Sequence, residues 1–259
     1  MRLEYYHVDA FAEVAFSGNP AGVCFLDRWL PDDVMQKIAL ENSVPETAFI
    51  VTGANDYRIR WFTPKVEVDL CGHATLASAH VLFHHKGVSD EAVQFISNSD
   101  TLMVENTGQM LVLNFPSRPP VPCIAPPELA LVLGQIPLEV LASRDYLVLL
   151  PSESNVRNLE PDMDLLRRLD KFGLIVTAKG EQADFVSRFF CPGGGIPEDP
   201  VTGSSHCTLI PYWARKLGKS SLKALQVSPR GGWLYCHYLG DRVRIGGHAV
   251  TYSQGFIEL

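Results

Sequence analysis

The sequence predicts an α+β fold of two related halves, in which a curved, mixed or mainly antiparallel sheet wraps one central helix in each half. A proline-rich stretch divides the 259 residues near their middle, and motifs that precede it recur in the same order after it. One predicted helix of the first half is apolar on every side, so other elements have to surround it. Alternating strand patterns at residues 57–61 and 110–114 supply that sheet.

The dividing stretch covers residues 116–127. Its prolines, at positions 116, 119, 120, 122, 126 and 127, permit neither a helix nor a central strand. We therefore expect a linker here, with a first repeat domain at residues 1–115 and a second at residues 128–248.

Four features of the first half recur in the second at nearly one offset. A Pro-Asp helix start at residues 30–33 matches residues 160–163, and the apolar strand 49–53 matches residues 174–178. Residues 60–64 match 188–192, and the glycine-bounded interval 72–87 matches 203–218. Collinear matches of this kind indicate an internal duplication.

The interval after Gly72 predicts a helix over residues 73–86 with Gly87 as its C-cap. Its apolar residues point to every side: Ala74, Leu76, Ala77, Val81, Leu82 and Phe83. His80 and His84 lie four residues apart on this helix, as in part of a zinc site. No glutamate accompanies them in an H-E-x-x-H pattern, so we predict no metal site.

Composition narrows the class of function. The formal net charge is −7 and no Lys/Arg cluster occurs, which disfavours nucleic acid and anionic membranes as partners. No signal-peptide pattern and no run of 18 apolar residues is present, so we expect a soluble, cytoplasmic protein. The six cysteines are scattered without a C-x-x-C pair, which predicts reduced thiols rather than disulfides.

Motifs in both halves carry a family pattern. They are Asp9-Ala10-Phe11, Gly18-Asn19-Pro20-Ala21, Glu46-Thr47-Ala48-Phe49, Phe62-Thr63-Pro64, Cys71-Gly72-His73-Ala74-Thr75 and Glu198-Asp199-Pro200-Val201-Thr202-Gly203-Ser204. In this order and spacing, over nearly the whole chain, they resemble the phenazine-biosynthesis isomerase-like family, which has the diaminopimelate epimerase superfold.

The resemblance implies two pseudo-symmetric domains, each a β-barrel-like sheet around a helix, with the active site between them. It implies that the last strand, near residues 249–259, returns to complete the first domain, and that the protein is a homodimer. It also implies catalytic roles for Glu46, His73 and Asp199. Because no cofactor motif occurs in the sequence, we expect catalysis without a cofactor. The substrate-binding positions that it implies are Asn19, Gly72, Gly203 and Ser204.

Glu46 breaks the symmetry of the repeats, because the alignment places Lys171 opposite it. A carboxyl among apolar neighbours suits a group that takes and returns a proton. The alternative is a surface glutamate at the start of a strand. The resemblance implies that Glu46 is the general acid/base.

His73 and Ser204 each follow the glycine that starts a predicted helix. Amide groups and the positive end of the helix dipole suit such a position to a carboxylate or a developing enolate. The alternative is that both are ordinary capping residues. Asp199 lies where the first repeat has Val68, and the resemblance implies that it orients the substrate, whereas we expect Glu198 to face solvent.

Cys71 suggests a second possible mechanism, in which two thiols act as acid and base, because distant epimerases of this superfold use two opposed thiols. Its repeat counterpart is Thr202, and Cys207 lies one turn further along the second helix, so little supports a thiol pair. Around the glycine motifs the sequence departs from the phenazine enzyme at Cys71, at residues 200–201 and at residues 205–206. We therefore expect another substrate.

The sequence thus predicts a cofactor-independent isomerase acting on a small carboxylated, cyclic or unsaturated metabolite. Two alternatives stay open: a two-base racemase or epimerase using Cys71, and a non-catalytic binding or interaction paralogue. The presence of Glu46, His73 and Asp199 together favours the isomerase.

Overall fold

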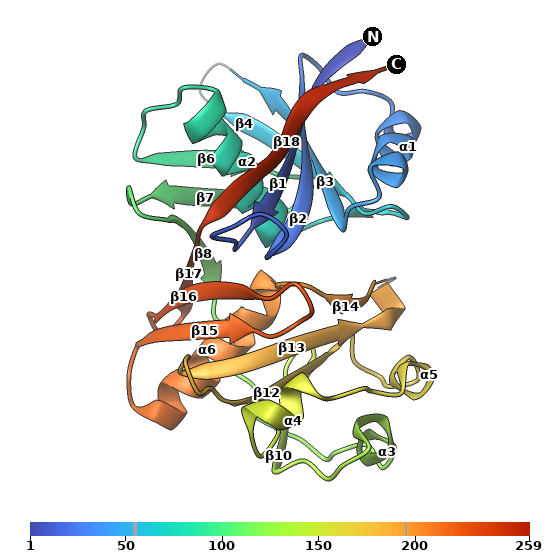
Figure 1. The fold of residues 1–259 in the computed structure, drawn as a ribbon, viewed down its shortest axis with the longest axis vertical. Helices are drawn as coiled ribbons and strands as arrows, with labels where there is room; N and C mark the ends of the chain where they lie inside the picture. The colour runs from blue at the N-terminus through green and yellow to red at the C-terminus, as the bar shows by residue number, and fades with distance from the viewer. Residues whose placement is uncertain (54–55, 195) are drawn as a thin grey trace. The chain divides into compact units, whose positions relative to one another are not determined.

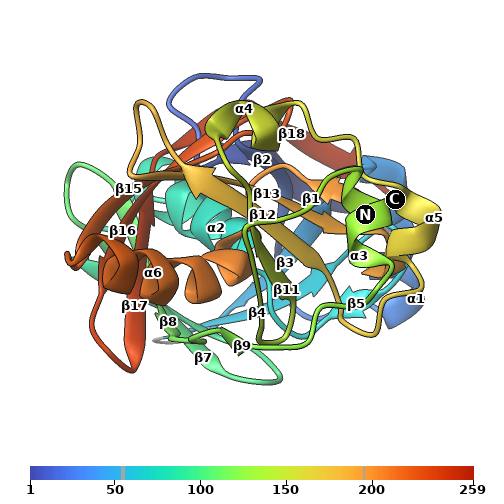
Figure 2. The same ribbon diagram turned by 90° about the horizontal axis from the view of Figure 1, so that it is seen from below.

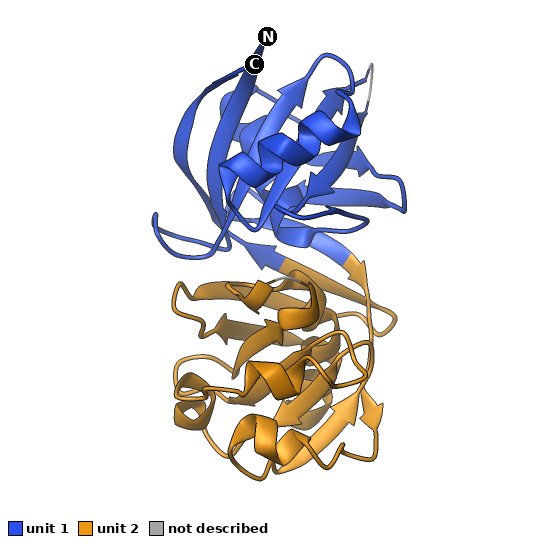
Figure 3. Cartoon of the chain, turned by 90° about the vertical axis from the view of Figure 1, so that its right-hand side faces the viewer, with its two compact units in different colours: residues 1–114, 246–259 blue, residues 115–245 orange. Residues whose placement is uncertain are grey.

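A computed structural model gives the fold and describes residues 1–53, 56–194 and 196–259 (Figure 1). The fold is α+β, as predicted, with many strands and few long helices. The chain forms two compact units, unit 1 with residues 1–114 and 246–259 and unit 2 with residues 115–245 (Figure 3). Within the described ranges, no helix has both the length and the apolar character needed to cross a membrane.

Unit 1 is a set of strands around the helix α2. Its strands are β1 (Arg2–Ala10), β2 (Asn19–Leu26), β3 (Glu46–Thr52), β4 (Tyr57–Phe62), β5 (Glu67–Val68), β6 (Ala92–Ile96), β7 (Thr101–Asn106) and β18 (Ala249–Glu258), and its helices are α1 (Asp32–Asn42) and α2 (Gly72–His85). α2 packs against β1, β2, β3 and β18. The two chain ends meet in this unit, because β18 pairs antiparallel with β1 (Figure 1).

α2 is the helix that the sequence predicts after Gly72. Every residue from His73 to Leu82 is buried, including the polar ones, which agrees with the apolar residues on all its sides. The helix ends at His85, and Gly87 follows with φ at +69°, a left-handed conformation that favours glycine.

Unit 2 has the same general build around α6. Its strands are β9 (Val121–Pro122), β10 (Glu139–Ala142), β11 (Tyr146–Leu149), β12 (Leu174–Lys179), β13 (Phe185–Cys191), β14 (Ile196–Asp199), β15 (Ser221–Gln226) and β16 (Gly232–Tyr238), and its helices are α3 (Leu129–Leu133), α4 (Glu153–Arg157), α5 (Met163–Leu166), a 3₁₀ turn (Pro192–Gly194) and α6 (Gly203–Leu217). α6 packs against β15 and β16 (Figure 2). β8 (Leu111–Pro116) and β17 (Arg242–Gly247) run across the two boundaries between the units.

Two local expectations differ from the structure. The proline-rich stretch is not wholly without structure, because Val121 and Pro122 form β9, which pairs with β10. Two residues at a strand edge tolerate a proline that a central strand would not. The second Pro-Asp motif, at residues 160–163, opens the short α5 rather than a helix of the length of α1.

The two units pair their strands in the same order and sense. In unit 1 the pairs β18–β1 and β1–β2 are antiparallel, β2–β3 is parallel, β3–β4 and β4–β5 are antiparallel, β4–β6 is parallel and β6–β7 is antiparallel. In unit 2 the corresponding pairs are β9–β10, β10–β11, β11–β12, β12–β13, β13–β14, β13–β15 and β15–β16, each with the matching sense.

A matching ion pair stands at the same place in both units. Arg60 of β4 donates from two nitrogens to Glu67 of β5, at 2.7 and 2.6 Å. Arg188 of β13 does the same to Glu198 of β14, at 2.6 and 2.9 Å. The expectation that Glu198 faces solvent is therefore wrong. A bidentate pair of this kind is strong and geometrically specific, so it links the two strands firmly.

Acid should destabilise unit 1 through His80. Burial, with a smaller effect of His84 and His85, lowers the pKa of this ring from 6.5 to about 3, and its Nε2 lies 2.9 Å from the hydroxyl of Thr251. Between these two pKa values the unfolded chain binds the extra proton and the folded chain does not, so stability falls as pH falls. We expect His80 to cost about 2 kcal/mol in the free energy of unfolding between pH 7 and pH 5.

The test is chemical denaturation of the parent and of His80→Gln at both pH values. Glutamine keeps a donor near Thr251 but does not titrate, so the variant should lose about 2 kcal/mol less on acidification. His237→Gln, which replaces a histidine of β16 in unit 2, is the matched control and should behave as the parent does. Equal pH dependence in the parent and His80→Gln would contradict the assignment.

Candidate active site

A buried carboxylate and a buried imidazole meet in unit 1. Glu46 is the first residue of β3, beside Ala21 of the parallel strand β2, and His73 is the second residue of α2. Glu46 Oε2 lies 3.2 Å from His73 Nε2, and the two side chains are 13% and 6% exposed. Neither atom has a well-aligned hydrogen bond to another described residue, so the contact is an ion pair rather than an ideal hydrogen bond.

Two further side chains contact the opposite side of the His73 ring. Asn19 Nδ2 lies 3.2 Å from Nδ1, and Cys71 Sγ lies 3.5 Å from the same nitrogen. Asn19 is fully buried at the start of β2. Gly18 makes this position possible, because its φ is +68° and a Cβ there would lie 2.2 Å from the carbonyl oxygen of Ala10.

The charge of His73 is set by its acidic neighbours. Burial alone lowers the pKa of this ring, but Cys71 and Glu46 reverse the effect and raise the pKa well above 6.5. Burial and Glu46 also raise the pKa of the Cys71 thiol, which is therefore neutral at pH 7. Glu46 is then the anion that holds the imidazolium, through an attraction of about 5 kcal/mol at an effective dielectric constant near 20, enough to offset a desolvation cost of several kcal/mol.

Asn19 suits both charge states of His73. Its amide nitrogen donates to Nδ1 of the neutral ring, whose single proton then sits on Nε2 and faces Glu46. After rotation of the amide, the Asn19 oxygen accepts from Nδ1 of the imidazolium. The ring therefore keeps a partner at Nδ1 whether or not it carries the second proton.

The first residues of α2 and α6 show that His73 and Ser204 are not the N-caps of these helices. The N-caps are Cys71 and Thr202, and neither helix has a side-chain cap hydrogen bond. The interpretation of His73 and Ser204 as capping residues is therefore wrong. Gly72 and Gly203 are the first residues of the two helices, so both helices begin with backbone amides that no capping side chain occupies.

Asp199 is held in unit 2 by a chain of hydrogen bonds. The Thr202 hydroxyl donates to Asp199 Oδ2 at 2.5 Å. Gln226, which is fully buried, donates to the Thr202 hydroxyl at 3.1 Å and to the Asp199 carbonyl oxygen at 2.7 Å. Its own oxygen accepts from the Thr202 amide at 2.9 Å. The carboxylate thus stands in a defined orientation at the end of β14.

Sequence reasoning missed two residues that support the proposed ones, Arg144 and Gln226. Arg144 lies between β10 and β11 and donates to the Ser204 hydroxyl at 3.2 Å. The available signal was the polar run Ser143-Arg144-Asp145 in a hairpin turn. Gln226 gave no signal, because a buried glutamine in a strand is recognised only once its partners are known.

The strand registers change one detail of the repeat alignment. Thr47 pairs with Phe62 in unit 1, and Leu174 pairs with Phe190 in unit 2. When Phe62 is superposed on Phe190, Glu46 falls opposite Gly173 rather than Lys171. Glu46 still has no acidic counterpart in the second unit.

A metal ion does not suit the cluster in this arrangement. Glu46, Cys71 and His73 each offer a ligand atom, all within 4.8 Å of one another. However, His73 turns Nε2 to Glu46 and Nδ1 to Cys71. An imidazole binds an ion along one nitrogen lone pair, so one ion cannot reach both other ligands without rotation of the ring.

The thiols do not form an acid/base pair either. Cys207 is buried within α6, and burial raises its pKa to about 11. Its sulfur lies 3.7 Å from the carbonyl oxygen of Gly203 in its own helix. The position that matches Cys71 is held by Thr202, whose hydroxyl is committed to Asp199.

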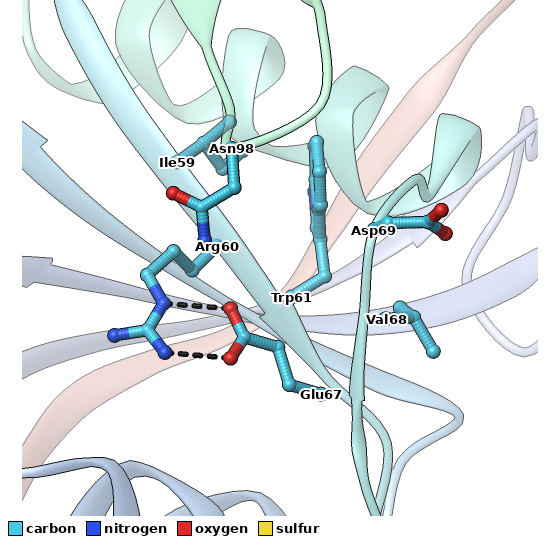
Figure 4. A pocket seen from close by; sticks show the side chains of 7 residues that line it. All are labelled: Ile59, Arg60, Trp61, Glu67, Val68, Asp69 and Asn98. Atoms are coloured by element: carbon cyan, nitrogen blue, oxygen red, sulfur yellow. Dashed lines mark hydrogen bonds and ion pairs between the residues drawn. The ribbon is translucent and has the colours of Figure 1, made fainter.

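A separate pocket of about 230 Å³ opens in unit 1, and its charged lining residues are Arg60, Glu67 and Asp69. Its lining is Ile59, Arg60, Trp61, Glu67, Val68, Asp69 and Asn98 (Figure 4). It lies where the edge of β4 passes from pairing with β6 to pairing with β5. Arg60 and Glu67 neutralise each other across it, as the dashed lines show (Figure 4). Glu46 and His73 do not line this pocket.

Residues 8–255 match the family model of the phenazine biosynthesis-like proteins. The chain belongs to this family. The resemblance drawn from the motifs is thereby confirmed.

Relatives in the phenazine biosynthesis-like family match over their full length. A Pseudomonas aeruginosa protein named uncharacterized isomerase is 54% identical, with all of both chains covered. A solved PhzF-family phenazine biosynthesis protein from Enterococcus faecalis is 47% identical, with a TM-score of 0.98 over all of both chains. A hydroxyproline epimerase from Agrobacterium vitis, 9% identical, shares the fold with a TM-score of 0.64 over 99% of this chain and 92% of its own.

The site residues expected from the family pattern fall into two local groups. In unit 1, Asn19, Glu46 and His73 are in mutual contact through the His73 ring, and Gly72 precedes that histidine in α2. In unit 2, Asp199, Gly203 and Ser204 lie at the end of β14 and the start of α6.

Replacement of Glu46 should lower the pKa of His73. In Glu46→Gln the anion beside Nε2 is lost while burial remains, so the ring should titrate well below its value in the parent. The measurement is the pH dependence of the His73 ring nitrogens by NMR. Cys71→Ala is the control, and its His73 pKa should stay above 6.5. A pKa that falls in Cys71→Ala but not in Glu46→Gln would make the thiolate, not Glu46, the controlling anion.

Proposed function

We propose that the chain is a cofactor-independent isomerase that moves a proton on a small carboxylated, cyclic or unsaturated metabolite by general acid/base catalysis. The observation that carries the proposal is the buried Glu46–His73 pair at the start of α2. The names of its relatives support the isomerase class.

In this proposal Glu46 and His73 have different roles. Glu46 takes a proton from a carbon next to the carboxylate-conjugated system and returns it at another carbon. The His73 imidazolium and the amides at the start of α2 stabilise the negative charge that develops on the substrate meanwhile. No step in this scheme uses a nicotinamide, a flavin, pyridoxal phosphate or a metal ion.

The remaining residue roles are proposed on the family pattern and on local geometry. Asp199 orients a polar group of the substrate, supported by the hydroxyl that Thr202 donates to it. Gly203 and Ser204 bind the substrate at the start of α6, and Gly72 does so at the start of α2. Asn19 acts through His73, since it is buried against that ring.

We also propose that the two units are pseudo-symmetric domains that arose by duplication, each a barrel-like sheet around its helix. The matching strand pairings and the Arg60–Glu67 and Arg188–Glu198 pairs support this. From the family pattern we further propose a homodimer, and from the composition a cytoplasmic location.

Two other functions are less well supported. A racemase with Cys71 as one base would need an opposed acid, and Thr202 stands at the matching position. A non-catalytic paralogue would be expected to lose Glu46, His73 or Asp199, and all three are present.

Glu46→Gln should abolish proton transfer while the fold is kept. General acid/base catalysis contributes about 10²–10⁴-fold, so turnover should fall by about a hundredfold or more with substrate binding largely intact. The measurement is carbon-bound deuterium uptake from D₂O by a panel of cyclic and unsaturated carboxylates, in the presence of EDTA and without added cofactor. Matched melting curves check the fold. A variant that exchanges at the parent's rate, or a parent that needs added metal, would contradict the proposal.

Cys71→Ala and Asp199→Asn should differ in effect. The alanine variant should retain most of its activity, because Cys71 is a neutral thiol beside the ring. Asp199→Asn should lose about tenfold or more through a weakened charge-assisted hydrogen bond. The same exchange assay measures both. An inactive but folded Cys71→Ala would restore the thiol mechanism.

A further inference from the structure

Arg144 contacts a proposed substrate-binding residue in unit 2. Its Nη2 donates to the Ser204 hydroxyl oxygen at 3.2 Å. Ser204 is the second residue of α6, and Arg144 belongs to the turn between β10 and β11. The contact therefore joins a hairpin turn to the start of the helix.

The guanidinium of Arg144 is fixed from two other directions. Its Nε and Nη2 donate to the Asp145 carboxylate at 2.9–3.2 Å, and the Asp145 side chain is 2% exposed. The centre of the guanidinium lies 4.7 Å from the centroid of the Phe172 ring. A planar cation held by a bidentate carboxylate and by an aromatic ring has little freedom to turn.

This arrangement decides where the hydroxyl hydrogen of Ser204 points. An arginine has donors only, so the Ser204 oxygen is the acceptor in the contact. The one hydrogen of the hydroxyl must then point away from Arg144, and no described residue accepts it. A hydroxyl whose oxygen accepts from a cation is also a stronger donor. Ser204 is thus ready to donate to an added acceptor.

The charge near the first turns of α6 favours an anionic acceptor. Arg118, Arg144 and Arg242 all act to lower the pKa of Cys207, one turn along the helix, while the nearby carboxylates already have partners, since Asp145 pairs with Arg144 and Asp199 accepts from Thr202. The amides of the first turn add to the positive field of these arginines. A carboxylate is the acceptor that such a field attracts most strongly.

We propose that Arg144 is a positioning residue that aims the Ser204 hydroxyl at the carboxylate of the substrate. The inference rests on the proposed function, because Ser204 is taken there as substrate-binding. It parallels unit 1, where Asn19, also next to a hairpin turn, contacts the residue that follows the first glycine of α2.

Benzoate is the probe, titrated to 50 mM with the NMR shift of the backbone amide of residue 204 as the readout. The proteins are the parent, Arg144→Met, Arg144→Lys, Ser204→Ala and the Arg144→Met/Ser204→Ala double variant. Arg144→Met should weaken binding about tenfold, and Arg144→Lys by a similar factor, because lysine keeps the charge but not the fork. The double variant should bind no more weakly than Ser204→Ala, since Arg144 acts through that hydroxyl.

Three results would overturn the proposal. The first is that Arg144→Lys binds benzoate as tightly as the parent. The second is that the loss of affinity in the double variant equals the product of the losses in the two single variants. The third is that the amide of residue 204 does not shift when benzoate is added to the parent. Arg167→Met is the matched control. Arg167 is exposed and pairs with Asp164 at 2.6 Å, so this variant should bind benzoate as the parent does.

A second variant is needed if Arg144→Met does not fold. Loss of Arg144 leaves the buried Asp145 carboxylate without its cation, which is costly. Arg144→Met/Asp145→Asn removes that charge and should fold with the same tenfold loss of benzoate binding; parental affinity in this folded variant would also overturn the proposal. Deuterium exchange by the parent is scored separately, so a failure here does not coincide with a failure of the acid/base proposal.

Discussion

The burial of α2 is the constraint on which unit 1 depends. A helix with ten consecutive buried residues has to be surrounded by other elements, and here β1, β2, β3, β7 and β18 cover it. Because the helix is held on all sides, its first turn is held as well. His73 therefore stands at a fixed place, where the first residue of β3 meets it as Glu46 and the first residue of β2 as Asn19.

Burial also explains the chemistry of this corner. A carboxylate and an imidazole 3.2 Å apart in water would share a weak contact, whereas here each is the other's main compensation for lost solvent. Each group therefore depends on the charge of the other. Asn19, whose amide can rotate, offers the ring a partner at Nδ1 in either charge state.

The two units keep a common frame and differ in the residues placed on it. Strand order, strand sense and the bidentate arginine–glutamate pair recur, since these determine how the strands pack. In the aligned strand registers, Glu46 is equivalent to Gly173, and Asp199 is equivalent to Val68. Residues that break a repeated pattern without a packing reason are good candidates for function.

The sequence by itself determined the α+β class, the position and burial of α2, the start of α6, the strands 49–53 and 174–178, and the family, because periodicity, glycine placement and motifs are local properties of the chain. Only the tertiary structure decided the contacts across the chain. It showed that Glu198 pairs with Arg188, that Gly173 matches Glu46, and that Arg144 and Gln226 support Ser204 and Asp199. These relations depend on strand register and side-chain direction between distant segments, and no local pattern in the sequence encodes either one.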